Sequence, residues 1–148
     1  MTEKTDTARR ARMGLVAKAP PARLAALMAG VEVPGFDWLR APEVGGVMVR
    51  GRMGGTGAPF NLGEMTVTRC ALRLATGEVG HGYVQGRDKA HAERAALVDA
   101  LMQTDRAEAV QAQVLDPLAE AALTAKATRA AKAAATKVDF FTMVRGED

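Results

Sequence analysis

The segment spanning residues 84–101, V-Q-G-R-D-K-A-H-A-E-R-A-A-L-V-D-A-L, is the strongest guide to the fold because a strand pattern changes there into a helix pattern. Gly86 ends the predicted strand, and a helix is predicted to begin at Asp88, whose carboxylate is a favoured N-cap. One side of this helix is expected to face the core: His91, Ala95, Val98 and Met102, flanked by Leu97 and Leu101. A strand that leads into an amphipathic helix predicts helices packed on a sheet.

The first turn of the predicted helix is crowded with charged or titratable side chains: Arg87, Asp88, Lys89, His91 and Glu93. Cations in a first turn oppose the positive end of the helix macrodipole, at a cost of about 0.3–1 kcal/mol each. An anion bound at the helix start would offset that cost. The alternative is that Arg87 and Lys89 point into solvent or pair with the two carboxylates. These residues are therefore candidates for an anion-binding or inter-subunit surface.

Two helices are expected before the sheet. Residues 5–19 are predicted to form the first helix, with Arg9, Arg10 and Arg12 exposed. The following proline pair, residues 20–21, ends this helix and begins the second, which Gly30 terminates.

Four strands are predicted next, at residues 36–41, 47–53, 64–75 and 79–85. The first two are expected to be joined through residues 44–46, and the turn at residues 76–78 makes a hairpin of the last two. In the third strand the apolar face changes near Arg69, which predicts a β-bulge there. Two helices, a roughly four-stranded antiparallel sheet and further helices make up the expected α+β fold.

The C-terminal part is predicted to contain a helical arm and an apolar tail. Ten of the seventeen residues from 119 to 135 are alanine, which favours a helix over about 119–137. We expect residues 1–137 to form one α+β domain and residues 138–148 to bind a partner. The apolar residues of this tail are Phe140, Phe141, Met143 and Val144. The alternative is that the tail folds back onto its own domain.

Composition limits the class of protein. A chain of 148 residues that is 48% hydrophobic is expected to bury one core. No apolar run approaches the roughly 20 residues of a membrane span, and the N-terminus lacks a secretory pattern, so we expect a cytoplasmic location. The net charge of +3 permits an anionic ligand without requiring one.

A second candidate surface lies at residues 47–60, V-M-V-R-G-R-M-G-G-T-G-A-P-F. Two arginines and a glycine-rich loop follow a predicted strand there: Arg50, Arg52, Gly54, Gly55, Thr56 and Gly57. Backbone N–H groups of such loops bind phosphates. However, the P-loop lysine is missing, and Phe60 stands where the dinucleotide fingerprint requires its third glycine. Gly80-x-Gly82 fails the same fingerprint at Gln85. A tight turn with glycines at positive φ is the alternative for the loop.

No metal or cofactor is expected to bind to this chain alone. His91 and Glu93 match the first half of a zinc deaminase signature, but the second half needs two cysteines and Cys70 is the single cysteine. Cys70 lies near Leu72 and Leu74, so we expect an unreactive core residue. His91 borders the apolar stripe and is expected to be half-buried and hydrogen-bonded.

Three long blocks occur in a fixed order: R-M-G-G-T-G at residues 52–57, G-R-D-K-A-H-A-E at 86–93 and V-D-F-F-T-M-V-R-G at 138–146. With these blocks the chain resembles the PhnG family, whose members are components of the bacterial carbon–phosphorus lyase core complex. The resemblance covers the chain from about Arg40 onward, except for the alanine-rich stretch.

The resemblance implies a mainly structural component that acts in phosphonate catabolism and is not catalytic alone. In that family, the I and H subunits and an ATP-binding protein act with the PhnG component. Together they displace adenine from ATP with a phosphonate, and the product with methylphosphonate is α-D-ribose 1-methylphosphonate 5-triphosphate. The nucleosidase-type chemistry is attributed to the I subunit and the later radical cleavage to the iron–sulfur J subunit. The implied partners are chiefly the I subunit, and also the H and J subunits, while ATP and phosphonate are handled by the complex and neither a membrane nor nucleic acid is implied.

The competing interpretation is an independent phosphate-, nucleotide- or RNA-binding module that uses the exposed cations of both candidate surfaces. The mild net charge weakens it, and so does the scarcity of aromatic residues, because RNA-binding sheets stack bases on aromatic rings. A stand-alone hydrolase is the least favoured class, since no catalytic triad or paired-carboxylate motif is present.

Overall fold

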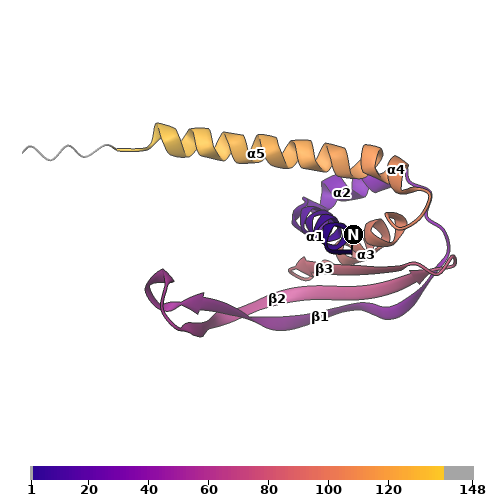
Figure 1. Cartoon of the computed structure of the whole chain (residues 1–148), viewed down its shortest axis with the longest axis horizontal. Helices are drawn as coiled ribbons and strands as arrows, with labels where there is room; N and C mark the ends of the chain where they lie inside the picture. The colour runs from indigo at the N-terminus through magenta and orange to yellow at the C-terminus, as the bar shows by residue number, and fades with distance from the viewer. Residues whose placement is uncertain (1, 139–148) are drawn as a thin grey trace, which may run out of the picture.

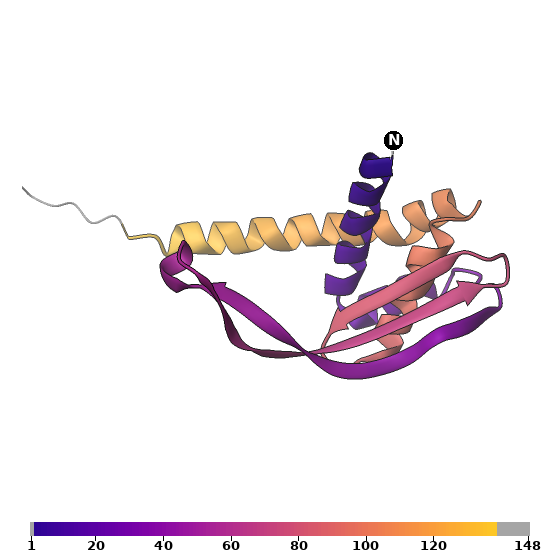
Figure 2. The same ribbon diagram turned by 60° about the horizontal axis from the view of Figure 1, so that its bottom comes forward.

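The computed structural model describes residues 2–138, with side chains from residue 6 onward (Figures 1 and 2). Its elements, in chain order, are α1 Thr2–Lys18, α2 Pro21–Met28, β1 Phe36–Arg52, the 3-10 turn η1 Met53–Gly55, β2 Pro59–Leu74, β3 Val79–Gln85, α3 Lys89–Leu101, α4 Ala107–Val110, the π-helical turn η2 Gln111–Leu115 and α5 Asp116–Ala135. This order confirms the expected α+β fold.

Within residues 2–138 the sheet has three antiparallel strands in the order β1-β2-β3. β1 runs without interruption through residues 44–46, so the two strands expected at 36–41 and 47–53 are one. Glycine did not break the strand because Gly45 and Gly46 stay in the ladder, opposite Val67 and Thr66. A Cβ on Gly46 would collide with the side chain of Glu64, so this glycine also makes room for its neighbour on β2.

The bulge expected near Arg69 lies on the opposite strand. Arg40 pairs with Ala71 and Glu43 pairs with Arg69, so β1 contains the extra residue at this register shift. A bulge bends the strand that contains it and increases its local twist. The long hairpin of β1 and β2 is accordingly curved in both views (Figures 1 and 2).

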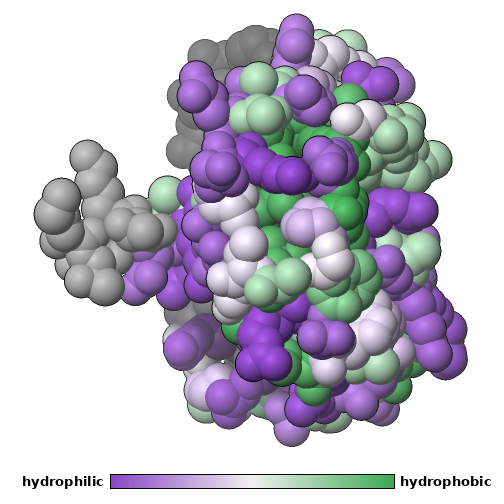
Figure 3. All heavy atoms as spheres, turned by 90° about the vertical axis from the view of Figure 1, so that its right-hand side faces the viewer, coloured by the Kyte–Doolittle hydropathy of each residue, from purple (hydrophilic) through white to green (hydrophobic). Residues whose placement is uncertain are grey.

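The core lies between one face of the sheet and the helices. α3 packs on β2 and β3, while α1 and α2 pack against α3, and the other face of the sheet carries no helix from the described part of the chain (Figure 1). The buried surface of α3 is wider than the predicted stripe, because Ala92, Ala96 and Ala100 are buried as well. Viewed from the end of the molecule opposite the projecting elements, apolar side chains form a band between hydrophilic borders (Figure 3).

α4, η2 and α5 form one continuous helix with a π-helical turn. Pro117 lies at the start of α5, where its ring and missing N–H disfavour the normal hydrogen bond to the preceding turn. A π-turn is a common local adjustment of this kind. Beyond this turn α5 leaves the core, and every residue from 120 to 138 is exposed.

Two projecting elements extend from the core toward the same side, namely α5 and the distal part of the β1–β2 hairpin (Figures 1 and 2). We call the exposed part of α5, residues 120–135, the arm, and residues 50–60 the hairpin tip. The arm confirms the helix predicted for the alanine-rich stretch. No helix within residues 2–138 has both the length and the apolar character to cross a bilayer.

Candidate functional site

The hairpin tip is closed by its own backbone. Gly54 and Gly55 have φ values of 57° and 83°, in the left-handed region that favours glycine. The N–H of Gly57 donates to the carbonyl of Met53 at 2.7 Å. A Cβ on Gly57 would lie 2.6 Å from that carbonyl oxygen, so a side chain cannot be added there without moving the loop. The glycine spacing is therefore explained by the turn itself.

The two arginines of the tip differ in their surroundings. Arg52 donates from Nη1 to the carbonyl of Gly57 at 3.1 Å, which holds its guanidinium against the loop. Arg50 makes no such contact with the described residues. Both side chains are exposed, and neither forms an ion pair with any residue in the described part of the chain. The tip therefore presents two unneutralised cations, and an anionic partner for them stays a prediction.

The start of α3 has the predicted cap. Asp88 has extended backbone angles, and its carboxylate accepts a hydrogen bond from the N–H of His91 at 2.9 Å. Gly86 precedes it with a φ of 92°. Its carbonyl accepts from the Thr68 hydroxyl at 2.7 Å, and its N–H donates to the Thr66 carbonyl at 2.9 Å. These bonds fix the turn between β3 and α3 onto β2.

The charged residues of this turn do not share one surface. Arg87, Asp88 and Lys89 are exposed, whereas Glu93 is half-buried. His91 is only 4% exposed, and its Nε2 lies 2.9 Å from the carbonyl oxygen of Val16 on α1. The histidine is thus hydrogen-bonded, as expected, but more deeply buried than half. It belongs to the contact between α3 and α1, so the outward part of this surface consists of Arg87, Asp88 and Lys89.

The two candidate surfaces lie apart on the molecule. The turn before α3 sits beside Thr66, which pairs with Gly46, while Arg52 at the tip pairs with Pro59. Six residues of β1 separate these positions, which corresponds to about 20 Å along a strand. The fold therefore does not combine the two sets of cations into one anion site.

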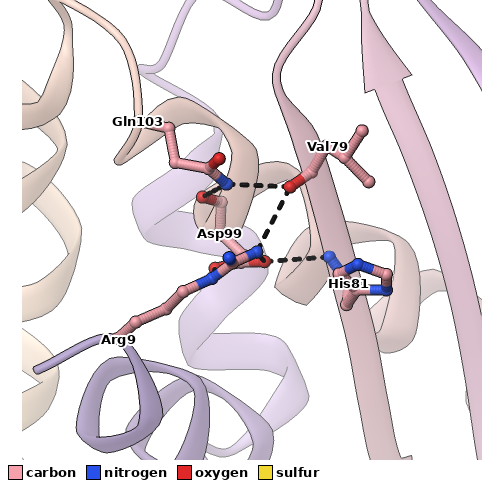
Figure 4. Close-up of polar contacts among 5 residues, drawn as sticks. All are labelled: Arg9, Val79, His81, Asp99 and Gln103. Atoms are coloured by element: carbon pink, nitrogen blue, oxygen red, sulfur yellow. Dashed lines mark hydrogen bonds and ion pairs between the residues drawn. The ribbon is translucent and has the colours of Figure 1, made fainter. Parts of the chain in front are cut away.

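A polar cluster that the sequence did not predict lies between α1, α3 and the free edge of β3 (Figure 4). The Asp99 carboxylate is 3% exposed and accepts two hydrogen bonds from Arg9, from Nε at 2.8 Å and from Nη2 at 2.7 Å. It also accepts from the N–H of His81 at 3.0 Å. The carbonyl of Val79 accepts from Gln103 at 2.8 Å and from Arg9 at 3.3 Å.

This cluster covers the exposed edge of the sheet. Val79 and His81 would otherwise present an unpaired carbonyl and an unpaired N–H on an edge strand. The hydrogen bond to Asp99 raises the pKa of Arg9 and holds the guanidinium charged. Arg9 is therefore not a free surface cation, contrary to the expectation. The sequence feature that could have indicated a buried role for Asp99 is the presence of an acidic residue within the apolar stretch A-L-V-D-A-L of α3.

Cys70 is buried, and its Sγ–H donates to the carbonyl of Ala92 at 3.2 Å. Burial raises the pKa of this thiol to about 11. These facts confirm an unreactive core residue. Among residues 2–138, no group of three or more His, Cys, Asp or Glu side chains is arranged to hold a metal ion. The predicted partner-binding residues Phe140, Phe141, Met143 and Val144 lie outside the described residues.

Comparison with known proteins relates the chain to one family. The family model described as "Phosphonate metabolism protein PhnG" matches residues 7–146. The chain is also 49% identical over 142 residues to the alpha-D-ribose 1-methylphosphonate 5-triphosphate synthase subunit PhnG of Rhizobium meliloti (strain 1021). This alignment covers 95% of the chain and 90% of the relative.

Proposed function

Because the chain belongs to the PhnG family of phosphonate metabolism proteins, we propose that it is a component of a cytoplasmic carbon–phosphorus lyase complex with α-D-ribose 1-methylphosphonate 5-triphosphate synthase activity. The complex would join methylphosphonate to the ribose triphosphate of ATP and release adenine. In this proposal the chain contributes to assembly and does not perform the chemistry alone. The I subunit is the chief proposed partner, with the H and J subunits also present.

The observation that carries the assembly role is the pair of projecting elements. The hairpin beyond the core exposes several large apolar side chains: Met48, Met53, Phe60 and Leu62, of which Met53 and Leu62 are 68% and 66% exposed. The arm is exposed over its whole length. Most helical stability in proteins comes from tertiary packing, so packing of the arm on another chain would stabilise it. Clustered exposed apolar residues are typical of protein–protein contacts.

The polar groups of the core also support a structural role. Asp99 is the acidic residue that is most deeply buried among those described, and both its oxygens are already hydrogen-bonded by Arg9 and His81. Cys70 is protonated at neutral pH, and burial raises its pKa to about 11, further from the thiolate form. Neither group is placed to act as a base or nucleophile. ATP and the phosphonate are therefore proposed to bind elsewhere in the complex.

The test is co-expression of the full-length chain with the H, I and J subunits, followed by affinity purification through a tag on the I subunit. We expect the chain to co-purify, and adenine release from ATP and methylphosphonate to require it. A variant with Phe60→Ala and Leu62→Ala should co-purify less, since each buried large apolar side chain contributes about 1.5–3 kcal/mol. Val33→Ala, at an exposed residue outside the hairpin, is the matched control.

The outcome that contradicts the proposal is a monodisperse wild-type chain that is not retained by the other subunits. Nucleotide or RNA binding by that isolated chain would then favour the independent-module interpretation. The family membership argues against an independent binding module. The separation of the two pairs of cations and the mild net charge of the chain argue against it as well.

A further inference from the structure

A groove of about 980 Å³ runs between α5 on one side and α1 with the start of α2 on the other. Its floor is formed by small or apolar residues of both walls, including Gly14 and Leu15 of α1 and Leu118, Ala122 and Ala125 of α5. The helix α5 lies beside α1 and α2 over the core and then extends beyond the core (Figure 1). The groove is thus open along the arm, where nothing in the described chain covers it.

The rim of the groove has one sign of charge. Arg10, Lys18 and Arg23 line it from α1 and α2, and Arg129 lines it from α5, while no acidic residue is among its lining. None of these four cations forms an ion pair with a described residue. The sequence contains no Asp or Glu from residue 7 to 31 or from residue 121 to 138. Glu120 belongs to the α5 wall but does not line the groove, so neither wall contributes an acidic side chain to the lining.

The dimensions of the groove fit a helix. Its α5 wall extends from Leu118 to Arg129, which corresponds to three turns and about 16 Å. A helical segment of that length, about 10 Å across, has a volume of about 1,260 Å³, so it would fill the groove and protrude from its open side. The small side chains on both walls allow a third helix to approach closely, at an interaxial distance of about 8–10 Å.

We propose that this groove, which we call the basic groove, binds a helix of another subunit of the complex, with a small or apolar face toward the floor and Asp or Glu side chains toward the rim. The proposal rests on the proposed function and specifies the chemistry of the partner. Charge complementarity selects this occupant. A second copy of the chain would bring the same positive walls together, and a small anion would leave the apolar floor exposed to water.

Photo-cross-linking within the co-expressed complex identifies the occupant directly. A benzophenone side chain replaces Ala125, which lines the groove, and in the control replaces Leu123, which is exposed on α5 but does not line it. We expect the Ala125 probe to cross-link to one helical segment of another subunit that is rich in Asp and Glu. Cross-links to the chain's own residues 139–148 or to a second copy, or no cross-link within the assembled complex, would overturn the proposal.

Charge reversal provides an independent readout. The double variant Arg10→Glu and Arg129→Glu is expected to bind the other subunits about tenfold more weakly or worse, with a greater loss at low salt, because its carboxylates would face those of the partner. Lys126→Glu with Lys132→Glu makes the same change of charge outside the lining and should lose much less. If both variants lost the same amount of affinity for the other subunits, the basic groove would not be the contact, and the proposal would be wrong. A wild-type chain that never enters the complex would instead refute the proposed function.

Discussion

At the scale of single residues, Gly80 and Gly82 show how a pattern typical of nucleotide binding arises from packing. Both lie on β3 facing α3, and a Cβ on either would collide with a backbone carbonyl of the helix, that of Ala96 or Ala92. The helix can lie this close only because the strand has no side chains there. The spacing of two matches the alternation of a strand, so the glycines line one face.

Gly82→Ala is therefore expected to destabilise the protein by about 1–3 kcal/mol, the usual cost of overpacking a close contact. The measurement is the urea dependence of unfolding of the full-length chain. Gly45→Ala is the control, because a Cβ at Gly45 would have no atom within 4 Å. It should change stability by no more than about 0.5 kcal/mol. Equal effects of the two substitutions would contradict this account of the contact.

The buried thiol of Cys70 predicts a dependence on alkaline pH. Burial raises its pKa from 9.0 to about 11, so the folded state keeps a proton that the unfolded state loses between these values. The contribution of the buried, protonated thiol to the free energy of unfolding is fully present below pH 9 and decreases as the pH rises toward 11. Cys70→Ala should flatten this part of the stability curve, measured by urea unfolding across the range. An unchanged slope would exclude the thiol as its cause.

At the scale of elements, the edge of β3 is protected by side chains that come from distant parts of the chain. Arg9 and Asp99 are ninety residues apart in sequence, yet both take part in covering the strand between Val79 and His81. An uncovered edge strand is a template for pairing with another chain. The cluster therefore favours the monomeric sheet over edge-to-edge association.

Asp99→Ala is expected to destabilise the chain by about 1–3 kcal/mol, because it leaves the His81 N–H and the partly exposed Arg9 guanidinium without their acceptor. Increased self-association should accompany this loss, and analytical ultracentrifugation of the full-length variant measures it. Glu43→Ala removes a carboxylate that binds two arginines on the exposed surface, so little change is expected there. An Asp99→Ala variant as stable and as monomeric as Glu43→Ala would contradict the role of the cluster.

Sequence patterns predicted elements well where local rules act alone. The cap at Asp88, the helix over the alanine-rich stretch and the hairpin of the last two strands depend on neighbouring residues, and all are present. Continuity of β1 through residues 44–46 was not predictable, because Gly46 is required by the side chain of Glu64 across the sheet. Asp99 was missed for the same reason, since its partner Arg9 lies on another helix.

At the scale of the whole molecule, the sequence could not reveal that the hairpin and α5 project toward the same side. That arrangement depends on the continuous β1 strand and on the continuation of the helix through the π-helical turn Gln111–Leu115 into α5. The length of β1 also separates the two candidate cation surfaces, a distance that residue spacing alone does not give. The resulting molecule has a small compact core and two exposed extensions (Figure 2).

The bare arm makes a copy without partners vulnerable to degradation. Lys126, Arg129 and Lys132 are all exposed on a helix that has few tertiary contacts, and such helices open locally at little cost. A protease that cleaves after basic residues would first cut the arm of a copy that has no partner subunits. The core, with its buried α3, would be cleaved more slowly. A copy whose arm is seated in the complex would be shielded. Surplus copies would thus be removed, so the supply of this chain would follow that of its partners.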